Sequence, residues 1–507
     1  MRVAQPPATL DLVSTAISVT ATTTSGAVQG LRTGDVVAFL GVPYAAAPVG
    51  DRRFRAPEPA LGWSGIRKAV AHGPTPPMPG YPRPIAALVA NPAIPGDEYL
   101  NLSVWTPDPG AHGLPVLVWV PGGGFVNGSN AVPVTDGSAF ARDGVVTVAI
   151  NYRLGVEGFA LLPDAPPNLG LLDQVAALEW VRDNIAAFGG DPDIVTVAGE
   201  SAGAMSIGAL LAMPRATGLF RRVVLQSGAA HHTLRPATAS RVTEFVAAQL
   251  EVPGTAAALR DVPSEQIIAA QKALFRELRR PDPARWREVV TNIMPFEPVV
   301  DGDVLPGPPL ERIAAGSAAG VDVLVGSNRH EYRFFVVPTG VVDRADEALL
   351  AAVAASYRLP PAAVQRYQAA SPAATPGLVM SEIATDWFYR IPSLRLAEAV
   401  SGSNVYEFGW EAPTSGLGAC HYSEVPFVFD MLTDPGAAPL VGPAPPRALA
   451  EAMHRAWVGF AATGDPGWPA YMPDRRAVAR FGNGDDPGWE VVDDPRGDLR
   501  ELWDGIR

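Results

Sequence analysis

The chain has 507 residues, of which 48% are hydrophobic and 18% are charged, and its 39 Lys and Arg against 52 Asp and Glu give a net charge of -13. This composition is typical of a folded globular protein with a large core and excludes a mostly disordered chain. The acidic balance argues against nonspecific binding to nucleic acid or to an anionic membrane, because both would be repelled. Neutral or small organic partners fit better.

Cysteine content and the N-terminal sequence bear on the compartment. The single cysteine, Cys420, has no partner for an intramolecular disulfide. The N-terminal stretch has an early Pro-Pro pair and Asp11 where a secretory signal needs an unbroken apolar run. No window approaches the roughly 20 apolar residues that span a bilayer. We therefore expect a soluble, cytoplasmic protein that acts as a monomer or a small homo-oligomer.

Residues 1–24 are rich in Pro, Ala and Thr and are expected to form a flexible arm. The stretch 171–188 places apolar residues at helical spacing, and a Gly-Gly-Asp-Pro sequence ends that helix. A second helix, built of small residues, is predicted over 202–213. Short apolar runs predict strands at 100–105, 115–120, 145–151, 194–198, 223–226 and 321–325.

Alternation of helices with buried strands is typical of an α/β protein with a mostly parallel sheet covered on both faces. Two helix-rich stretches, 233–293 and 343–399, are expected to cover the edge of this sheet as a lid or gorge wall. No fixed-period repeat and no long Gly/Ser linker divides the chain. We therefore expect residues 25–507 to form a single domain.

The first feature that indicates chemistry is Gly199-Glu200-Ser201-Ala202-Gly203, which lies between a predicted strand and a predicted helix. This pattern fits a nucleophile elbow, in which a strained turn exposes the serine hydroxyl and small neighbours avoid steric clashes. The pentapeptide alone is also compatible with a plain Gly-rich loop. The flanking strand and helix favour a nucleophile, because the helix N-terminus supplies the Ala202 N–H and a positive dipole.

A glycine loop, Pro121-Gly122-Gly123-Gly124-Phe125, follows the strand predicted at 115–120. Three consecutive glycines let backbone N–H groups converge where side chains would obstruct them. A phosphate-binding loop does not fit, because no Gly-Lys-Ser/Thr follows. We expect Gly123, Gly124 and Ala202 to form an oxyanion hole, a plain turn being the alternative.

A serine nucleophile needs a base, and spacing alone does not choose among the histidines. In elbow-type hydrolases the chain order is serine, acid, histidine, which favours His330 or His421. The seven candidates are His72, His112, His231, His232, His330, His421 and His454.

These motifs together resemble the type-B carboxylesterase family, which includes bacterial para-nitrobenzyl esterases and animal cholinesterases. Besides the elbow and the glycine loop, the resemblance rests on segments 41–45 (GVPYA), 100–107 (LNLSVWTP), 151–155 (NYRLG), 168–174 (NLGLLDQ), 188–192 (FGGDP) and 226–228 (QSG). It runs nearly from end to end of the chain and implies an α/β-hydrolase fold with helical insertions.

The resemblance implies a serine carboxylesterase in which Ser201 is the nucleophile, Glu331 the acid and His421 the general base. Glu200 and Ser227 are implied as auxiliary residues. His330 takes the place of a usual Asp beside Glu331, and Cys420 becomes a neighbour of His421. The substrate pocket is expected to include Phe125 and Phe429.

Two departures from the family pattern stand out. Pro121 replaces the histidine that usually precedes the glycine triplet, so we expect altered rate or specificity without loss of activity. A disulfide cysteine expected near Tyr99 is absent, which agrees with a bacterial intracellular form.

We therefore expect hydrolysis of small or medium neutral carboxylic esters through an acyl-enzyme. Three alternatives stay open: an amidase or carbamate hydrolase, a lipase, and a non-catalytic interaction module of the same fold. No metal-ligand cluster, Cys-x-x-Cys pair or dinucleotide fingerprint occurs, so no cofactor and no metal are expected. Water is the expected co-substrate.

Overall fold

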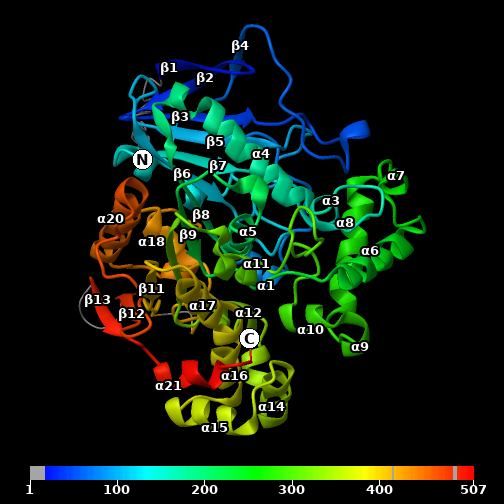
Figure 1. The fold of residues 1–507 in the computed structure, drawn as a ribbon, viewed down its shortest axis with the longest axis vertical. Coiled ribbons are helices and arrows are strands. Elements are labelled where there is room, and N and C mark those ends of the chain that lie inside the picture. The colour runs from blue at the N-terminus through cyan, green and yellow to red at the C-terminus, as the bar shows by residue number, and fades with distance from the viewer. Residues whose placement is uncertain (1–16, 414–415, 483–487, 507) are drawn as a thin grey trace, which may run out of the picture.

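The computed structural model describes residues 17–413, 416–482 and 488–506, and a large mixed β-sheet runs through its centre (Figure 1). In sheet order the strands are β1 (Ile17–Thr23), β2 (Gly26–Thr33), β3 (Val36–Pro43), β5 (Asn101–Thr106), β7 (Val146–Ile150), β6 (Leu114–Val120), β8 (Gly190–Glu200), β9 (Arg222–Gln226), β10 (Asp322–Asn328), β11 (Asn404–Phe408), β12 (Ala477–Phe481) and β13 (Trp489–Asp493), while β4 (Ile66–Lys68) pairs with β2.

Neighbouring strands from β7 to β12 run parallel, whereas the strand pairs on either side of this block are antiparallel, apart from β4, which pairs with β2 in parallel. Every residue of β7 and β9 is buried. Such strands carry continuous apolar runs because helices cover both faces of the sheet. The strands predicted from apolar runs are all present, which confirms the α/β class.

Two hydrophobic cores lie on opposite faces of the sheet. One packs α4 (Leu169–Asn184), α5 (Ala202–Leu210) and α17 (Ile391–Ala399) against the strands. The other packs α2 (Ser138–Arg142), α18 (Val425–Val428) and α20 (Arg447–Thr463). The chain thus builds three layers, with the strands in the middle layer.

The helix-rich stretches form two groups outside these layers (Figure 1). The first group lies on the right in that view and comprises α6 (Pro236–Leu250), α7 (Ala256–Leu259), α8 (Ser264–Glu277), α9 (Pro283–Trp286) and α10 (Glu288–Asn292). The second lies at the lower end and comprises α14 (Glu347–Ser356), α15 (Pro361–Ala370) and α16 (Pro376–Thr385). A π-helical turn, η6 (Asp386–Arg390), joins α16 to α17.

Several element boundaries differ from the sequence prediction. The helix predicted over 171–188 is α4 followed by a 3-10 turn, Ile185–Phe188, and it ends at Gly189, whose φ of 86° favours glycine. The helix predicted over 202–213 ends at Leu210. The expected arm lies outside the described residues up to residue 16, whereas residues 17–23 form β1, because they pair with β2 along their whole length.

Buried ion pairs tie the loops to this framework. Arg153 and Asp173 pair at 2.7 Å with side chains that are 1% and 0% exposed. Glu157 pairs with Arg53 at 2.6 Å and accepts a hydrogen bond from the Tyr99 hydroxyl, also at 2.6 Å. The family resemblance would place a disulfide cysteine near Tyr99. In this chain the Tyr99 hydroxyl instead makes a long-range hydrogen bond to a buried ion pair.

No helix in the described part of the chain is both long and apolar enough to cross a membrane.

Candidate active site

Ser201 lies between the end of β8 and the first residue of α5. Its φ of 55° and ψ of -124° are sparsely populated for a residue with a side chain, and such strain costs about 1 to 3 kcal/mol. The elbow is possible because its flanks are small: a Cβ on Gly203 would lie 2.1 Å from Val120 O, and one on Gly199 would lie 2.9 Å from the same atom. These contacts explain the glycines on both sides of the serine.

The glycine loop lies directly beside the elbow. It follows β6, which pairs with β8 so that Val120 faces Gly199, and a Cβ on Gly122 would lie only 3.1 Å from Ser201 Cβ. The Gly123 and Gly124 N–H groups donate no hydrogen bond to any described residue. Ala202 begins α5, so its N–H has no acceptor within the helix. These N–H groups could stabilise a negative oxygen near Ser201.

His421 and Glu331 form a buried pair. His421 Nδ1 lies 2.7 Å from Glu331 Oε2, and the side chains are 5% and 0% exposed. The other oxygen, Glu331 Oε1, accepts a hydrogen bond of 2.7 Å from the Asn328 N–H at the end of β10. The two residues meet because β10 pairs with β11, and the loops that follow these strands carry Glu331 and His421. The carboxylate therefore fixes the orientation of the imidazole.

Glu200 approaches the other side of the imidazole. Its Oε1 lies 3.1 Å from His421 Nε2, close enough for an ion pair but not aligned as a hydrogen bond. Ser201 Oγ makes no hydrogen bond to any described residue, so the serine and the imidazole are not hydrogen-bonded to each other. Hydrogen bonds between catalytic groups are often long before substrate binds.

Burial and neighbouring charges shift the protonation of this site. Burial alone would lower the pKa of His421, but the Glu200 and Glu331 carboxylates raise it to about 9. Burial also raises the pKa of Glu200 well above its usual range, with Glu424 and Glu331 acting in the same direction and His421 against it. His421 and Glu200 therefore compete for one proton, and their titrations are coupled.

A third buried acid, Glu424, belongs to the same network and is absent from the sequence prediction. Its Oε1 accepts from Gln226 Nε2 at 3.1 Å and its Oε2 accepts from Asn328 Nδ2 at 2.5 Å. Burial and the nearby Glu331 raise its pKa to about 7. The available signal was a single acid directly before the apolar run 425–429, three residues after His421.

Aromatic side chains surround the imidazole. Tyr389 lies with its ring centre 4.8 Å from that of His421, and Phe335 and Phe334 lie at 5.4 Å and 5.8 Å. Phe334 and Phe335 come from α12 (Arg333–Val336), and Tyr389 comes from the turn η6. This packing excludes water from the histidine side of the site.

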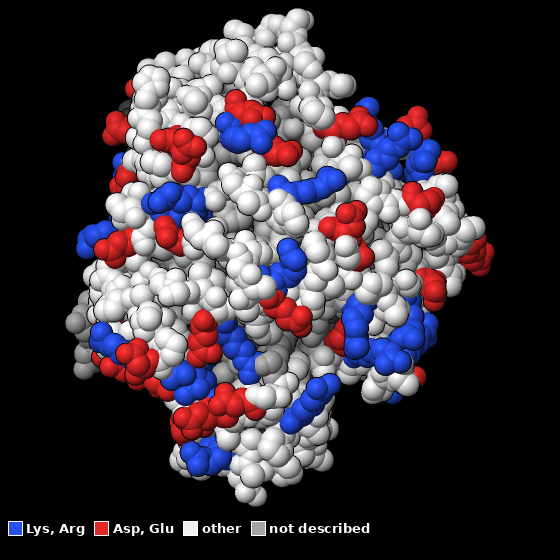
Figure 2. All heavy atoms as spheres, viewed as in Figure 1, with Lys and Arg blue, Asp and Glu red and all other residues white. Residues whose placement is uncertain are grey.

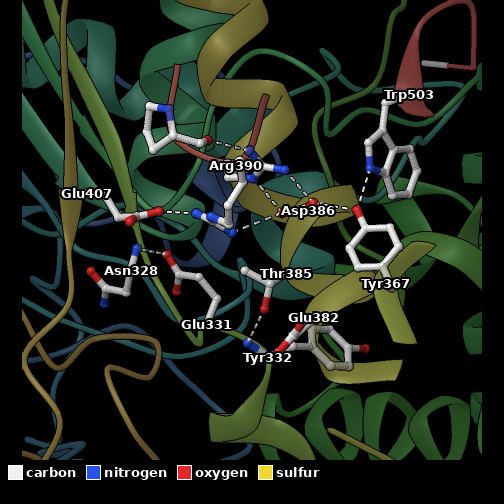
Figure 3. Close-up of polar contacts among 12 residues, drawn as sticks. Asn328, Glu331, Tyr332, Tyr367, Glu382, Thr385, Asp386, Arg390, Glu407 and Trp503 are labelled. Carbon is white, nitrogen blue, oxygen red and sulfur yellow. Dashed lines mark hydrogen bonds and ion pairs between the residues drawn. The ribbon is translucent and has the colours of Figure 1, made fainter. Parts of the chain in front are cut away.

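A buried ionic cluster anchors η6 (Figure 3). Asp386 lies between Arg390, which donates through Nε and Nη2 at 2.6 Å each, and the Tyr367 hydroxyl, which donates at 2.5 Å. Trp503 Nε1 in turn donates to Tyr367 at 2.8 Å. π-turns are frequent at functional sites, and this one presents Tyr389 to His421.

Ser201, His421 and the glycine loop all open into one cavity of about 780 Å³. Its wall is mostly apolar and includes Trp119, Phe334 and Tyr389. Ligand pockets are commonly about 300 to 1,000 Å³ with mainly apolar walls and a few polar groups. A small organic molecule could therefore reach Ser201 along a mainly apolar wall.

Some expected site residues lie elsewhere. Phe125 and Phe429 are fully buried and do not line this cavity, so placing them in the pocket was wrong. Phe125 packs on Phe159, and Phe429 packs on Trp119 from behind the cavity wall.

Ser227 is fully buried, and its hydroxyl has no hydrogen-bond partner among the described residues. The Cys420 thiol is buried, which raises its pKa. His330 Nδ1 accepts from the Ala419 N–H at 3.3 Å, and burial with nearby arginines lowers its pKa to about 2. Neither Cys420 nor His330 lines the cavity.

No group of three or more His, Cys, Asp and Glu residues in the described ranges is arranged to hold a metal ion.

A serine on a strand-to-helix elbow at the carboxyl edge of a largely parallel sheet is the arrangement of the α/β-hydrolase fold, and this chain has that fold. The chain belongs to the carboxylesterase family, whose family model matches residues 17–496. It is therefore a serine carboxylic-ester hydrolase, and the family resemblance drawn from its motifs is confirmed.

Relatives and solved structures match over nearly the whole chain. A para-nitrobenzyl esterase of Bacillus subtilis (strain 168) is 35% identical over 95% of this chain and 97% of its own length. A phenmedipham hydrolase of Pseudarthrobacter oxydans is 36% identical over 93% of this chain and 96% of its own. The crystal structure of the Geobacillus stearothermophilus carboxylesterase EST55 superposes with a TM-score of 0.83 at 38% identity, covering 96% of this chain and 99% of that one.

Proposed function

We propose that this protein hydrolyses carboxylic esters through a triad of Ser201, His421 and Glu331 and an acyl-enzyme intermediate. The observation that carries the proposal is the single cavity into which Ser201, His421 and the glycine loop open. The buried 2.7 Å contact between His421 and Glu331 supports the role of the pair, because a carboxylate on Nδ1 makes Nε2 the nitrogen that accepts a proton.

In the first half-reaction Ser201 Oγ attacks the ester carbonyl carbon and passes its proton to His421 Nε2. The bond to the alcohol oxygen then breaks, and His421 returns the proton to the leaving alcohol. Water attacks the acyl-enzyme in the second half-reaction, with His421 again taking and returning one proton. Glu331 holds the orientation of the imidazole and stabilises the imidazolium.

The oxyanion of each tetrahedral intermediate would accept hydrogen bonds from the Gly123, Gly124 and Ala202 N–H groups. The free Gly123 and Gly124 donors and the close approach of this loop to Ser201 support that role. Loss of one donor in such sites costs about 10² to 10³ in kcat. Pro121 contributes its carbonyl to a 2.8 Å hydrogen bond from the Tyr152 hydroxyl, so the loop keeps a support where the family has a histidine.

Glu200 would act beside the nucleophile as a proton store. When the shared proton lies on Glu200, His421 is neutral and able to act as a base; when it lies on His421, the base is blocked. The 3.1 Å contact between Glu200 Oε1 and His421 Nε2 supports this exchange.

Small or medium neutral esters fit the mainly apolar wall near Ser201. 4-Nitrobenzyl and 4-nitrophenyl esters are suitable probes, because a relative is a para-nitrobenzyl esterase.

The test is pre-steady-state hydrolysis of 4-nitrophenyl butyrate. We expect a burst of 4-nitrophenol equal to the enzyme concentration, since the acyl-enzyme accumulates. Ser201→Ala should lose both the burst and turnover, and Ser206→Ala, a buried serine on α5 outside the cavity, serves as the matched control. Labelling by an organophosphonate should be stoichiometric and should map to Ser201.

Wild-type turnover by Ser201→Ala would overturn the assignment of the nucleophile. Turnover without any labelling would indicate a route that needs no serine. Either result would leave the family membership intact and remove the proposed triad.

A further inference from the structure

The cavity has a charged wall that the proposed chemistry does not use. Lys272, Arg276 and Arg279 all line it, and we refer to these three residues as the cationic stripe. Lys272 and Arg276 lie four residues apart on α8, one helical turn, and the Arg279 N–H donates to Arg276 O, so the turn continues to Arg279. The spacing aligns the three side chains along about 10 Å of the wall.

The cationic stripe is not neutralised by nearby acids. None of its three side chains forms an ion pair or hydrogen bond with a residue in the described ranges. Glu277 pairs with Arg285 at 3.4 Å, and Asp282 caps α9 by accepting from the Ala284 N–H at 2.9 Å, so the acids of this segment have other partners. Glu200 is the sole acid among the described residues that line the cavity, and it is buried beside Ser201.

The local charge is opposite to that of the whole protein. Residues 272–287 contain six Lys and Arg against two Asp and Glu, whereas the chain as a whole has a net charge of -13. Figure 2 shows Lys and Arg gathered on the right of the view over α9 and α10, while both signs alternate over most of the remaining face. A local positive field at one wall attracts anions more strongly than the net charge would suggest.

We infer that the pocket selects esters that carry a carboxylate on the part of the molecule distant from the scissile bond, and that the cationic stripe binds this carboxylate. The inference rests on the proposed ester hydrolysis and narrows its substrate class: neutral esters fit the apolar wall, and esters with a distant carboxylate are preferred over them. Phe275 and Met294 also line the cavity and would contact the apolar link between the ester and the carboxylate. The cationic stripe lines a cavity and not a convex surface, so it suits a small anion.

The test compares substrates that differ in one charge. The mono-4-nitrophenyl ester of suberic acid has a free carboxylate on the acyl side, and its methyl ester is the neutral partner. 4-Acetoxybenzoate and methyl 4-acetoxybenzoate form the second pair, with the charge on the alcohol side. The quantity measured is the ratio of kcat/KM for the anionic ester to that for the neutral ester, in wild type and in variants.

We expect this ratio to fall about tenfold in the Lys272→Gln/Arg276→Gln/Arg279→Gln variant and about twofold in each single variant, for at least one substrate pair, because exposed charges contribute modestly and together. Added salt should lower the ratio in wild type and leave it unchanged in the triple variant. Arg280→Gln is the matched control, since Arg280 is an exposed arginine of the same segment that does not line the cavity. The single variants keep the test valid if the triple variant does not fold.

The outcomes separate the two proposals. A ratio that is unchanged in all stripe variants, with normal turnover of the neutral ester, overturns the inference and leaves the proposed function standing. Failure of wild type to hydrolyse any of the four esters overturns the proposed function itself. Equal losses in Arg280→Gln and the stripe variants show a general field effect and also overturn specific binding by the cationic stripe.

Discussion

The ionic cluster under η6 leads to a sharp prediction about stability. Asp386 and Arg390 have side chains that are 1% and 5% exposed and pair at 2.6 Å. Asp386→Asn replaces one of the two acceptor oxygens with an NH₂ group, which then faces a guanidinium or the Tyr367 hydroxyl. Breaking a buried pair by removing one partner costs about 3 to 5 kcal/mol, because the remaining charge is left uncompensated. We expect the free energy of unfolding to fall by that amount.

The assay is urea unfolding followed by tryptophan fluorescence, with the midpoint and slope compared between variants. The matched control is Arg366→Gln, which breaks an exposed Arg–Asp pair with Asp498 at 3.4 Å and 58% and 56% exposure. Exposed pairs contribute about 0 to 1 kcal/mol. The double variant Asp386→Asn/Arg390→Gln should be less destabilised than Asp386→Asn, since the uncompensated guanidinium is gone.

The pH dependence of this effect has a definite sign. Burial acts to raise the pKa of Asp386, but Arg390 and Arg496 outweigh it and hold the pKa below its usual value. The stabilisation is therefore complete above the unfolded pKa of about 3.9 and is lost as the pH falls through the folded pKa. The stability difference between wild type and Asp386→Asn should stay constant from neutral pH to about pH 4 and shrink below it. A difference under about 1 kcal/mol at pH 7 would refute the reasoning.

Three further predictions concern the reaction and use 4-nitrophenyl butyrate hydrolysis as the measurement. Glu331→Gln should lower kcat by about 10³ to 10⁴ with little change in KM, because the imidazole loses its buried carboxylate; a loss under about tenfold would contradict the role of Glu331. Glu200→Gln should move the midpoint of the kcat/KM profile to lower pH, because a neutral side chain no longer raises the pKa of His421, and an unmoved midpoint would exclude proton sharing. Gly123→Ala should lower kcat by about 10² to 10³, because its Cβ would lie 2.3 Å from Asn127 O and force the loop to move; unchanged kcat would argue against this oxyanion hole.

Local sequence patterns were sufficient for the strands and the elbow. Strand β7 could be predicted from a continuous apolar run, and helix α4 from apolar residues at helical spacing. The elbow could be predicted from the glycines around Ser201. Glycine is needed there because close approach to β6 leaves no room for a side chain. The pairing of Glu331 with His421 could not be derived from spacing, since it depends on β10 lying beside β11 in the sheet.

The incorrect placements share one cause, which is that position along the chain does not fix the direction of a side chain. Phe125 adjoins the glycine loop, yet its φ of 62° turns the side chain toward Phe159. Phe429 follows the histidine loop, yet it packs between Trp119 and Phe140 in the core. Both residues are next to the site in sequence and outside it in space.

The cationic stripe cannot be predicted from the sequence, for a related reason. Charged residues on an amphipathic helix usually form a solvated face, and the sequence of α8 fits that interpretation. Only the tertiary arrangement shows that this face of α8 borders the cavity. Glu424 and Tyr389 likewise gain their significance from contacts with elements that lie far away in the sequence.

The proposed catalytic groups and the cationic stripe lie in separate parts of this molecule. Ser201, Glu331 and the glycine loop follow strands of the central sheet, whereas the cationic stripe lies on α8, which packs on α6 and on α3 (Gly155–Phe159). Gln271 of α8 accepts a hydrogen bond from the Val156 N–H at 2.9 Å, which ties α8 to α3. Free-energy effects add when two sites share no partner. Stripe substitutions should therefore lower the ratio of kcat/KM for the anionic ester to that for the neutral ester by the same factor in Glu331→Gln as in wild type.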